Sequence, residues 1–385
     1  MLRFVVLTLV LGCTGSSSSS NPPAPKPLAT KPADAAVVAT APVDADVSKL
    51  PAEGQYMALC APCHGKDAKG YGADNSPSLV NPTFLESASD EFLKRSIVEG
   101  RPGTSMGAYG KARGGPLDDR AVDAVVGWIR AQGPAAKPLA AVGKGDAAGG
   151  TKLYAEYCKT CHGDATTRGT APHLANVAWQ QQASDAFIRY GIANGRPETK
   201  MAAFGSVMSA KQIDDLVAYI RVLGGAAPKI GQLPAPTGKE PLVLHPKGKD
   251  PVWKPRDGRF IGVDDVMKAY KEKRRMIIID ARPPSEWMRA HITGAVSIPY
   301  HEPARLDAIP KDVYVIAYCA CPHHLSGVVV DELIKRGHTK ALVLDEGINA
   351  WHTKGYPITA AEGVKAPALD PALDPAAQDH TGHGH

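Results

Sequence analysis

The chain contains two copies of one unit, and this duplication limits its possible folds more than any other feature. Both copies carry the same landmarks in the same order, which chance does not reproduce. In each, a tyrosine on a short helical pattern precedes Cys-x-x-Cys-His-Gly, then Pro-x-Leu, then Gly-Arg-Pro-x-x-x-Met. An amphipathic helix closes each copy, expected over Asp118–Ala131 and Ser209–Leu223. We predict two equivalent domains, copy 1 over residues 49–134 and copy 2 over residues 146–226.

The Cys-x-x-Cys-His segments predict the cofactor. This spacing is the attachment motif of c-type haem, in which two thiols form thioethers and the histidine becomes the proximal iron ligand. A thioredoxin-like redox pair or a zinc site is the alternative, but the repeated histidine argues against both. We therefore predict two covalently bound haem c groups, attached at Cys60, Cys63 and His64 and at Cys158, Cys161 and His162.

Both copies resemble the class I cytochrome c family, which has a compact all-α fold around one haem. In that family a methionine on the loop before the last helix closes the haem site, and Met106 and Met201 match its position. Thioether sulfur is a soft ligand, and His/Met ligation raises the haem potential relative to two nitrogen ligands. A lone methionine is more often core filler, but the repeated Gly-Arg-Pro setting favours the ligand.

The same resemblance implies supporting residues around each haem. In the family a proline carbonyl accepts the second ring N–H of the histidine, and Pro77 and Pro172 match it by order. Arg101 and Arg196 are expected to pair with haem propionates, because arginine binds carboxylates bidentately. A solvated surface arginine is the alternative for both.

A different pattern follows a predicted linker at residues 227–256. Short apolar runs alternate with helical segments, and their β-branched content predicts buried strands of an α/β domain over residues 257–361. The expected strands are Met276–Asp280, Val313–Tyr318 and Ala341–Leu344.

Five ordered motifs characterise this C-terminal domain. They are Asp-Ala-Arg-Pro-Pro-Ser-Glu-Trp from Asp280, His-Ile-x-Gly-Ala-x-x-Ile-Pro from His291, Tyr318-Cys319, Leu-Asp-Glu-Gly-Ile-x-Ala-Trp from Leu344 and Gly-Tyr-Pro-Ile from Gly355. Together they resemble the rhodanese family, a small α/β domain with a mainly parallel sheet. In rhodaneses a cysteine at the end of a strand accepts a sulfane sulfur, and the next loop and helix stabilise the anion. Cys319 matches that cysteine.

The loop after this cysteine departs from the family pattern. It runs Cys319-Ala-Cys321-Pro-His323-His324-Leu-Ser326, without the family's arginine and one residue longer. The missing arginine argues against phosphatase chemistry and against ordinary thiosulfate:cyanide sulfur transfer. Three interpretations remain: a modified sulfur-accepting site with a histidine supplying the positive charge, a thiol/disulfide or soft-metal site, and an inert docking domain. The candidate catalytic residues are Cys319, Cys321, His323 and His324.

The N-terminus predicts export. Arg3 precedes an apolar run, Phe4–Leu11, that is too short for the roughly 20 residues of a membrane-spanning helix. The stretch Leu9-Val10-Leu11-Gly12-Cys13 resembles a bacterial lipoprotein signal, which makes residues 1–12 the signal, Cys13 the lipidated residue and residues 13–48 a flexible tether. An ordinary cleaved signal with an incidental cysteine is the alternative.

Composition supports small domains joined by linkers. Aromatic residues make up only 6% of the chain, while it contains 38 Gly and 33 Pro. A linker is predicted at residues 135–145, and a disordered histidine-containing tail at residues 362–385. The net charge of +5 on 385 residues gives no case for nucleic-acid binding.

The sequence thus predicts a multidomain electron-transfer protein of the cell envelope, lipid-anchored on the periplasmic side. Its partners would be redox proteins of the envelope and a small sulfur-compound donor. We expect electron transfer to be coupled to sulfur binding or oxidation at Cys319. The alternatives are a pure electron carrier with a non-catalytic C-terminal domain, and a thiol-redox or soft-metal protein.

Overall fold

The computed structural model describes residues 46–70, 75–225, 229, 231–320 and 323–366. The predicted signal segment, the lipidation site Cys13 and most of the tether lie outside the described residues. So do Cys321 and most of the histidine-containing tail. No helix within the described part of the chain is both long enough and apolar enough to cross a membrane.

Copy 1 is all-α. Its helices begin where the sequence offers a capping side chain: Asn81, Ser89 and Asp118 each accept a hydrogen bond from a backbone N–H of the first turn. The predicted closing helix is confirmed and begins one residue later, because Asp118 is its cap. The elements, in order, are η1 (Val47–Lys49), α1 (Ala52–Leu59), α2 (Ala61–His64), α3 (Pro82–Ser87), α4 (Asp90–Glu99), η2 (Lys111–Arg113) and α5 (Asp119–Arg130).

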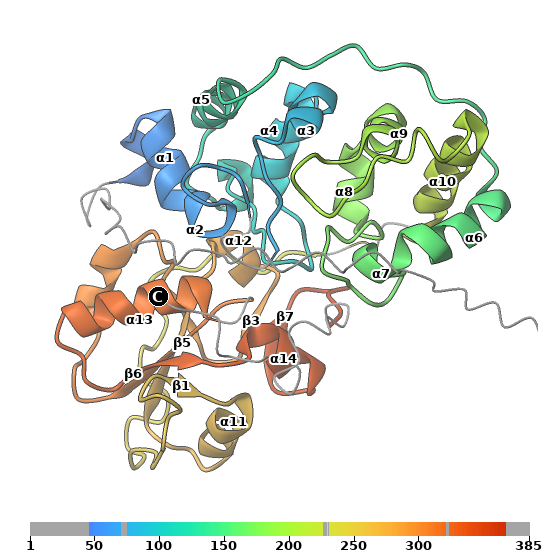
Figure 1. Ribbon diagram of the computed structural model, residues 1–385. Coiled ribbons are helices and arrows are strands. Elements are labelled where there is room, and N and C mark those ends of the chain that lie inside the picture. Colours follow the sequence, from blue (N-terminus) through green and yellow to red (C-terminus); the bar gives the residue numbers. More distant parts are fainter. Residues whose placement is uncertain (1–45, 71–74, 226–228, 230, 321–322, 367–385) are drawn as a thin grey trace, which may run out of the picture. The chain divides into compact units, whose positions relative to one another are not determined.

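Copy 2 repeats the five helices in the same order (Figure 1). Its caps repeat as well, since Asn176, Ser184 and Ser209 occupy the equivalent positions. The buried side chains of both copies form one continuous core, in which the rings of Phe92 and Phe187 stack with centroids 4.8 Å apart. The helices are α6 (Ala147–Tyr157), α7 (Lys159–His162), α8 (Val177–Gln182), α9 (Asp185–Asn194) and α10 (Ala210–Leu223).

The C-terminal domain is built on a five-stranded parallel sheet in the order β1-β6-β5-β2-β4. All three predicted strands are present, and only the strand before Cys319 begins one residue later than expected. A separate antiparallel pair joins β3 to β7. The strands are β1 (Phe260–Ile261), β2 (Met276–Asp280), β3 (Ala290–Ile292), β4 (Val296–Ser297), β5 (Tyr314–Tyr318), β6 (Ala341–Leu344) and β7 (Ile358–Ala360).

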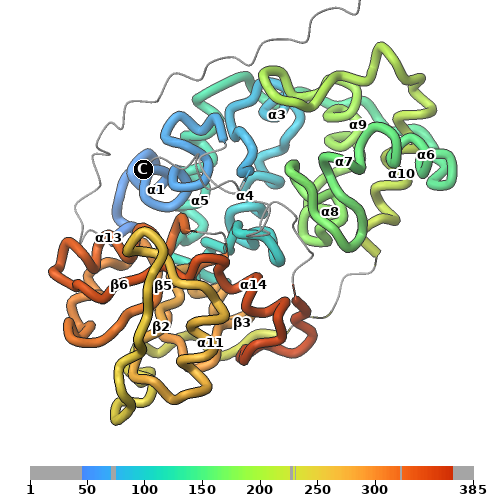
Figure 2. The backbone as a smooth tube through the Cα atoms, turned by 60° about the horizontal axis from the view of Figure 1, so that its bottom comes forward, coloured from blue at the N-terminus to red at the C-terminus, as the bar shows by residue number. Residues whose placement is uncertain are grey.

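Helices cover both faces of this sheet, which explains why the strands are continuous apolar runs. Ile277 and Ile279 of β2 pack on the same side as α13, whereas Ile278 packs with α11 and α14. Figures 1 and 2 show α13 beside β5 and β6. The helical elements are α11 (Val263–Lys271), α12 (Pro284–Trp287), η3 (Pro303–Ala308), α13 (His324–Lys335) and α14 (Gly347–Thr353).

The segment before this domain makes contacts that its composition does not predict. Leu244 exchanges backbone hydrogen bonds with Met276 of β2, at 2.8 and 3.2 Å. Leu233 donates its N–H to the carbonyl of Met288 at 2.7 Å. The described part of the predicted linker at residues 227–256 therefore lies along the C-terminal domain.

A buried ion pair stabilises the core of the domain. Arg282 donates two hydrogen bonds to the Asp280 carboxylate, at 2.9 and 2.7 Å, and a third to the carbonyl of Ala290 at 2.7 Å. Tyr318 also donates to Asp280, at 2.9 Å. Burial opposes the charge of Arg282, but the neighbouring carboxylate raises the pKa of the guanidinium above its ordinary value.

We predict that Arg282→Ala lowers the free energy of unfolding of this domain by about 3–5 kcal/mol, because Asp280 would stay buried without its charged partner. Urea denaturation followed by tryptophan fluorescence measures the loss. Arg336→Ala is the control, since its partners Glu332 and Asp307 lie nearer the surface and the expected loss is about 1 kcal/mol or less. Equal losses in the two variants would contradict the prediction.

Candidate haem sites and the cysteine loop

Each haem motif ends in a histidine whose ring is oriented by a carbonyl. The Nδ1 of His64 lies 2.9 Å from the oxygen of Pro77, and the Nδ1 of His162 lies 2.8 Å from the oxygen of Pro172. A carbonyl can only accept, so Nδ1 carries the proton and Nε2 keeps the lone pair. Both predicted proline contacts are confirmed, and each imidazole offers Nε2 as a ligand.

Burial keeps these imidazoles neutral. It lowers the pKa of His64 below its ordinary value of 6.5, and the hydrogen bond to Pro77 only partly opposes this shift. Burial lowers the pKa of His162 in the same way. Neutral imidazole is the form that binds a metal, so both side chains are in the state that haem ligation needs.

The repeated tyrosine has a structural role that the sequence did not reveal. The hydroxyl of Tyr56 donates to the carbonyl of Gly65 at 2.7 Å, and that of Tyr154 donates to Gly163 at 2.9 Å. Both tyrosines are almost fully buried. Because each accepting glycine directly follows the histidine, the bond ties the haem-binding turn to the first long helix of its copy.

A closed loop carries each methionine. In copy 1 the backbone N–H of Arg101 donates to the carbonyl of Met106 at 2.7 Å. Thr104 braces this loop, since its hydroxyl donates to the Arg101 carbonyl at 2.7 Å and accepts from the Met106 N–H at 3.1 Å. The sequence does contain a signal for this contact, because an alignment of the two copies places Thr104 and Thr199 at the same position. The same three bonds recur in copy 2 among Arg196, Thr199 and Met201.

Glycine is required where each of these loops begins. Gly100 and Gly195 have φ angles of +64° and +63°, in the left-handed region. A Cβ on Gly100 would lie 2.5 Å from the carbonyl carbon of Gly107, and one on Gly195 would lie 2.6 Å from that of Ala202. The loop therefore folds back closely on its own first residue.

Arg101 and Arg196 lie between the two copies. The guanidinium of Arg101 contacts the side-chain oxygen of Gln182 and stands 5.4 Å from the Phe92 ring. That of Arg196 stands 5.5 Å from the Phe187 ring. Burial lowers the pKa of each guanidinium to about 10, so both stay charged at neutral pH. Their pairing with haem propionates stays a prediction.

The two copies exchange equivalent contacts, as the subunits of a two-fold dimer do. Asn81 of copy 1 donates its side-chain amide to the carbonyl of Pro197 at 2.7 Å. Asn176 of copy 2 donates in the same way to Pro102 at 2.8 Å. Each accepting proline begins the methionine loop of the other copy. The two copies therefore contact each other through equivalent surfaces.

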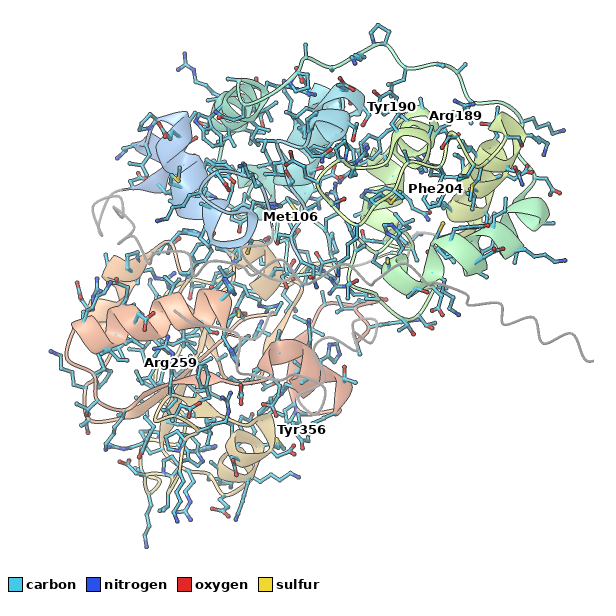
Figure 3. The ribbon with its side chains drawn as sticks, in the orientation of Figure 1. Met106, Arg189, Tyr190, Phe204, Arg259 and Tyr356 are labelled. Atoms are coloured by element: carbon cyan, nitrogen blue, oxygen red, sulfur yellow. The ribbon has the colours of Figure 1, made fainter. Side chains whose placement is uncertain are left out.

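The donor set of each copy fits a covalent haem c. It comprises two partly buried cysteine thiols on one helical turn, an imidazole Nε2 and a thioether on the loop before the last helix. Figure 3 labels Met106 on this loop of copy 1 and Phe204 on the equivalent loop of copy 2. The individual ligand assignments stay predictions.

Cys319 directly follows β5, and its side chain is fully buried. Its Sγ lies 3.3 Å from the hydroxyl of Ser326, in the first turn of α13. Its carbonyl accepts from the N–H of Ile348 at 3.0 Å. The cysteine therefore stands between the end of a parallel strand and the beginning of a helix, the setting that the rhodanese resemblance implies.

The predicted histidines begin α13. His324 is the first residue of the helix, and His323 precedes it with a φ of +74°. The Nε2 of His323 lies 2.5 Å from Asp345, which also accepts hydrogen bonds from Nη2 of Arg256 at 2.8 and 2.9 Å. Sequence reasoning missed both partners of this network, because they lie far from the loop along the chain.

Asp345 is held ionised by this network. Burial alone would raise its pKa, but hydrogen bonds from His323 and Arg256 lower it below the ordinary value of 3.8. The contact with Asp345 fixes the position of the His323 side chain at the start of α13. Cys321, the second cysteine of the predicted site, lies outside the described residues.

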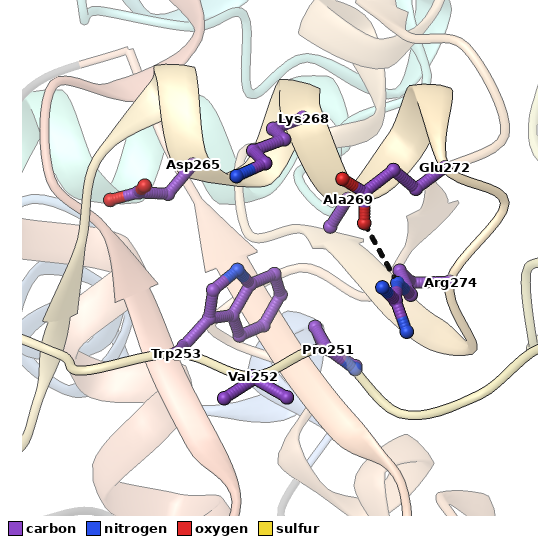
Figure 4. Close-up of a pocket in the computed structure, with 8 residues that line it drawn as sticks. All are labelled: Pro251, Val252, Trp253, Asp265, Lys268, Ala269, Glu272 and Arg274. Atoms are coloured by element: carbon purple, nitrogen blue, oxygen red, sulfur yellow. Dashed lines mark hydrogen bonds and ion pairs between the residues drawn. The ribbon is translucent and has the colours of Figure 1, made fainter.

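A surface pocket elsewhere in the domain takes no part in these sites. It lies between α11 and the segment Pro251–Trp253, where Glu272 and Arg274 form an ion pair at 2.9 Å (Figure 4). None of its lining residues belongs to a haem motif or to the cysteine loop.

These folds and sites define a cytochrome c electron-transfer protein that carries a rhodanese-like domain. The family model for cytochrome C oxidase, cbb3-type, subunit III matches residues 50–129 and 145–220. The model for the rhodanese-like domain matches residues 263–354. Since cytochrome c domains bind haem covalently, haem c is the cofactor of the helical region.

Curated relatives agree with both assignments. The chain is 30% identical over 212 residues to the cbb3-type cytochrome c oxidase subunit FixP of Azorhizobium caulinodans, covering 50% of this chain and 68% of that protein. A FixP subunit from Bradyrhizobium sp. is 30% identical over 177 residues, and the chain spans only 58% of its length. A sulfurtransferase of Allochromatium vinosum is 36% identical over 104 residues, which are 27% of this chain and 96% of that protein. The chain belongs to the cbb3-type cytochrome c family, with a rhodanese-like domain after the cytochrome region.

We predict that Asp345→Asn destabilises the C-terminal domain by about 1–2 kcal/mol at pH 7, because charge-assisted bonds to His323 and Arg256 are lost. The folded-state pKa of Asp345 is depressed, so its contribution is present above pH 3.8 and disappears as the pH falls through the lower folded value. Urea titrations at pH 7 and at pH 3 should show the difference from wild type shrinking in acid. A difference independent of pH would contradict the role of the ionised carboxylate.

Proposed function

We propose that this protein is a dihaem c-type cytochrome of the cell envelope, and that oxidation of a small sulfur compound at its C-terminal domain supplies the electrons. The observation that carries this proposal is a pocket shared by the two functional loops. Gly103 and Thr104 of the methionine loop of copy 1 line it together with Ala320, the residue after Cys319. The loop that follows Cys319 and the methionine loop of copy 1 would therefore line the same pocket.

The lining of this pocket suits a small anion. Arg289 and Lys365 bring positive charge, and Asn349 and His352 bring polar side chains, against the single carboxylate of Glu286. Inorganic sulfur donors such as sulfide and thiosulfate are anions at neutral pH. A further arginine, Arg282, also lines the pocket and already binds Asp280.

The haems are proposed at the two Cys-x-x-Cys-His segments, with His64 and Met106 as axial ligands in copy 1 and His162 and Met201 in copy 2. Each haem c, when bound, supplies a one-electron acceptor. Two such acceptors in one chain match a two-electron oxidation. Joining them covalently to the sulfur site raises the effective concentration of one site at the other.

The chemistry at Cys319 would convert sulfide to a persulfide. An S–S bond forms between Sγ of the Cys319 thiolate and the sulfur of HS⁻, one proton is released to solvent, and two electrons leave to two one-electron acceptors. The positive end of α13, which begins five residues after the cysteine, would stabilise the thiolate and the persulfide anion. His323, oriented by Asp345, is proposed as the positive charge that replaces the missing family arginine.

The place of the protein in the cell also follows as a proposal. The predicted lipoprotein signal and Cys13 would anchor the chain by a lipid on the periplasmic side of a membrane. Two of its relatives are named as subunits of cbb3-type cytochrome c oxidases. A redox protein of the envelope is therefore proposed as the electron acceptor.

A second function is a pure electron carrier in which the C-terminal domain only docks. The missing arginine of the cysteine loop favours this alternative, because such a loop lacks a group that rhodaneses use to hold their anion. A thiol-redox or soft-metal function of the Cys319-to-His324 loop is the third interpretation.

The coupled function predicts that sulfide reduces the oxidised dihaem protein, and that Cys319→Ser abolishes this reduction. Absorbance of the reduced haem measures the rate, and Cys321→Ser shows whether the second thiol is needed. Ascorbate serves as a control, because it should reduce wild type and both variants alike. Equal rates with sulfide in all three proteins would overturn the coupled function and leave the electron carrier.

The ligand assignment predicts that Met106→Leu and Met201→Leu each remove about half of the far-red methionine-to-iron band of the oxidised protein, and that the double variant removes it all. Absorption spectra at equal haem content test this. A band that survives in the double variant would show that other ligands bind the irons.

A further inference from the structure

The two methionine loops differ in burial although their sequences are alike. In copy 1 the residues after the methionine, 107–110, are all buried. In copy 2 the equivalent Ala202, Ala203 and Gly205 are exposed, and Phe204 is half-buried. The described residues all belong to one compact unit, residues 40–383, within which the C-terminal domain covers the first of these loops.

Ser285 makes the most direct contact. Its hydroxyl donates to the carbonyl of Ala108 at 2.8 Å and accepts from the N–H of the same residue at 3.1 Å. Ser285 belongs to α12 and is buried. One side chain of the C-terminal domain thus satisfies both backbone groups of the residue that stands second after Met106.

Tyr300 joins the two sides of the first haem site. Its hydroxyl donates to the carbonyl of Leu59 at 2.7 Å, directly before Cys60. The hydroxyl of Tyr109, on the methionine loop, lies 3.1 Å from the same oxygen. Tyr300 therefore bridges the segment that leads into the haem motif and the loop that carries Met106.

Close apolar packing completes the contact. A Cβ on Gly107 would lie 3.0 Å from Pro283, and one on Gly114 would lie 2.5 Å from Met288. Helix α13 also packs against α2, which carries the first haem motif. Copy 2, whose loop is exposed, has Ala202 where copy 1 has Gly107.

We propose that Ser285 and Tyr300 are positioning residues for the Met106 ligand, so that the C-terminal domain sets the properties of the first haem and not of the second. A ligand on a loop stays bound more firmly when neighbouring groups hold that loop in place. Within the described residues, no hydrogen bond joins the C-terminal domain to residues 201–207 of copy 2. The inference rests on the ligand assignment of the proposed function.

Imidazole, which displaces methionine from oxidised haem, tests this on the full-length dihaem protein. In a Met201→Leu background the far-red band reports Met106 alone, and in a Met106→Leu background it reports Met201 alone. Ser285→Ala with Tyr300→Phe should raise the imidazole affinity about tenfold in the first background, since the hydrogen bonds that hold the Met106 loop against the C-terminal domain are lost. In the second background the affinity should not change.

Ser297→Ala is the matched control. Ser297 is buried in the same domain, and its hydroxyl has no hydrogen-bond partner among the described residues. This variant should leave both affinities at their starting values. Far-UV circular dichroism of every variant serves to check that it folds.

Two results would overturn the inference alone: an affinity that does not change in the Met201→Leu background, or an equal rise in both backgrounds, which would indicate general loosening. Absence of the far-red band in the Met201→Leu background before any imidazole is added would be a different failure. It would show that Met106 is not a ligand, and would overturn the ligand assignment together with this inference.

Discussion

Each proposed haem site depends on one hydrogen bond, from Nδ1 of the motif histidine to a proline carbonyl. It selects the tautomer and leaves Nε2 as the ligand atom. The surrounding structure keeps this bond in place. A buried tyrosine ties the residue after the histidine to the first long helix, and in copy 1 Trp128 of the last helix stacks on that tyrosine at 4.2 Å. The helical core thereby holds the turn that carries each proposed histidine ligand.

Duplication created two equal units, and tertiary contacts make them unequal. Equivalent surfaces of the copies meet each other, as the reciprocal asparagine–proline bonds show. The methionine loops of the two copies, in contrast, have different neighbours. Ser285 and Tyr300 cover that of copy 1, while residues 202–203 of copy 2 are exposed. The methionine loop of copy 1 is therefore covered by the C-terminal domain, whereas the equivalent loop of copy 2 is open to solvent.

The C-terminal domain combines a rigid core with an altered loop. The buried Asp280–Arg282 pair and the parallel strands provide the usual support for a cysteine at a strand end. The loop beyond Cys319 departs from the rhodanese family, and there His323 is paired with Asp345. This contact with a carboxylate fixes the imidazole that we propose in place of the family's arginine.

The sequence by itself determined the fold class, the haem motifs and the strands, because these depend on local patterns. The apolar run Met276–Asp280 is buried on both faces, as its composition predicts, and the cap residues Asp118 and Ser209 mark where helices begin. Only the tertiary structure decided that Arg101 and Arg196 lie between the copies, that Asp345 holds His323, and that Ser285 binds Ala108. These partners are far apart along the chain, and a hydrogen bond between distant residues leaves no periodicity that a single sequence could display.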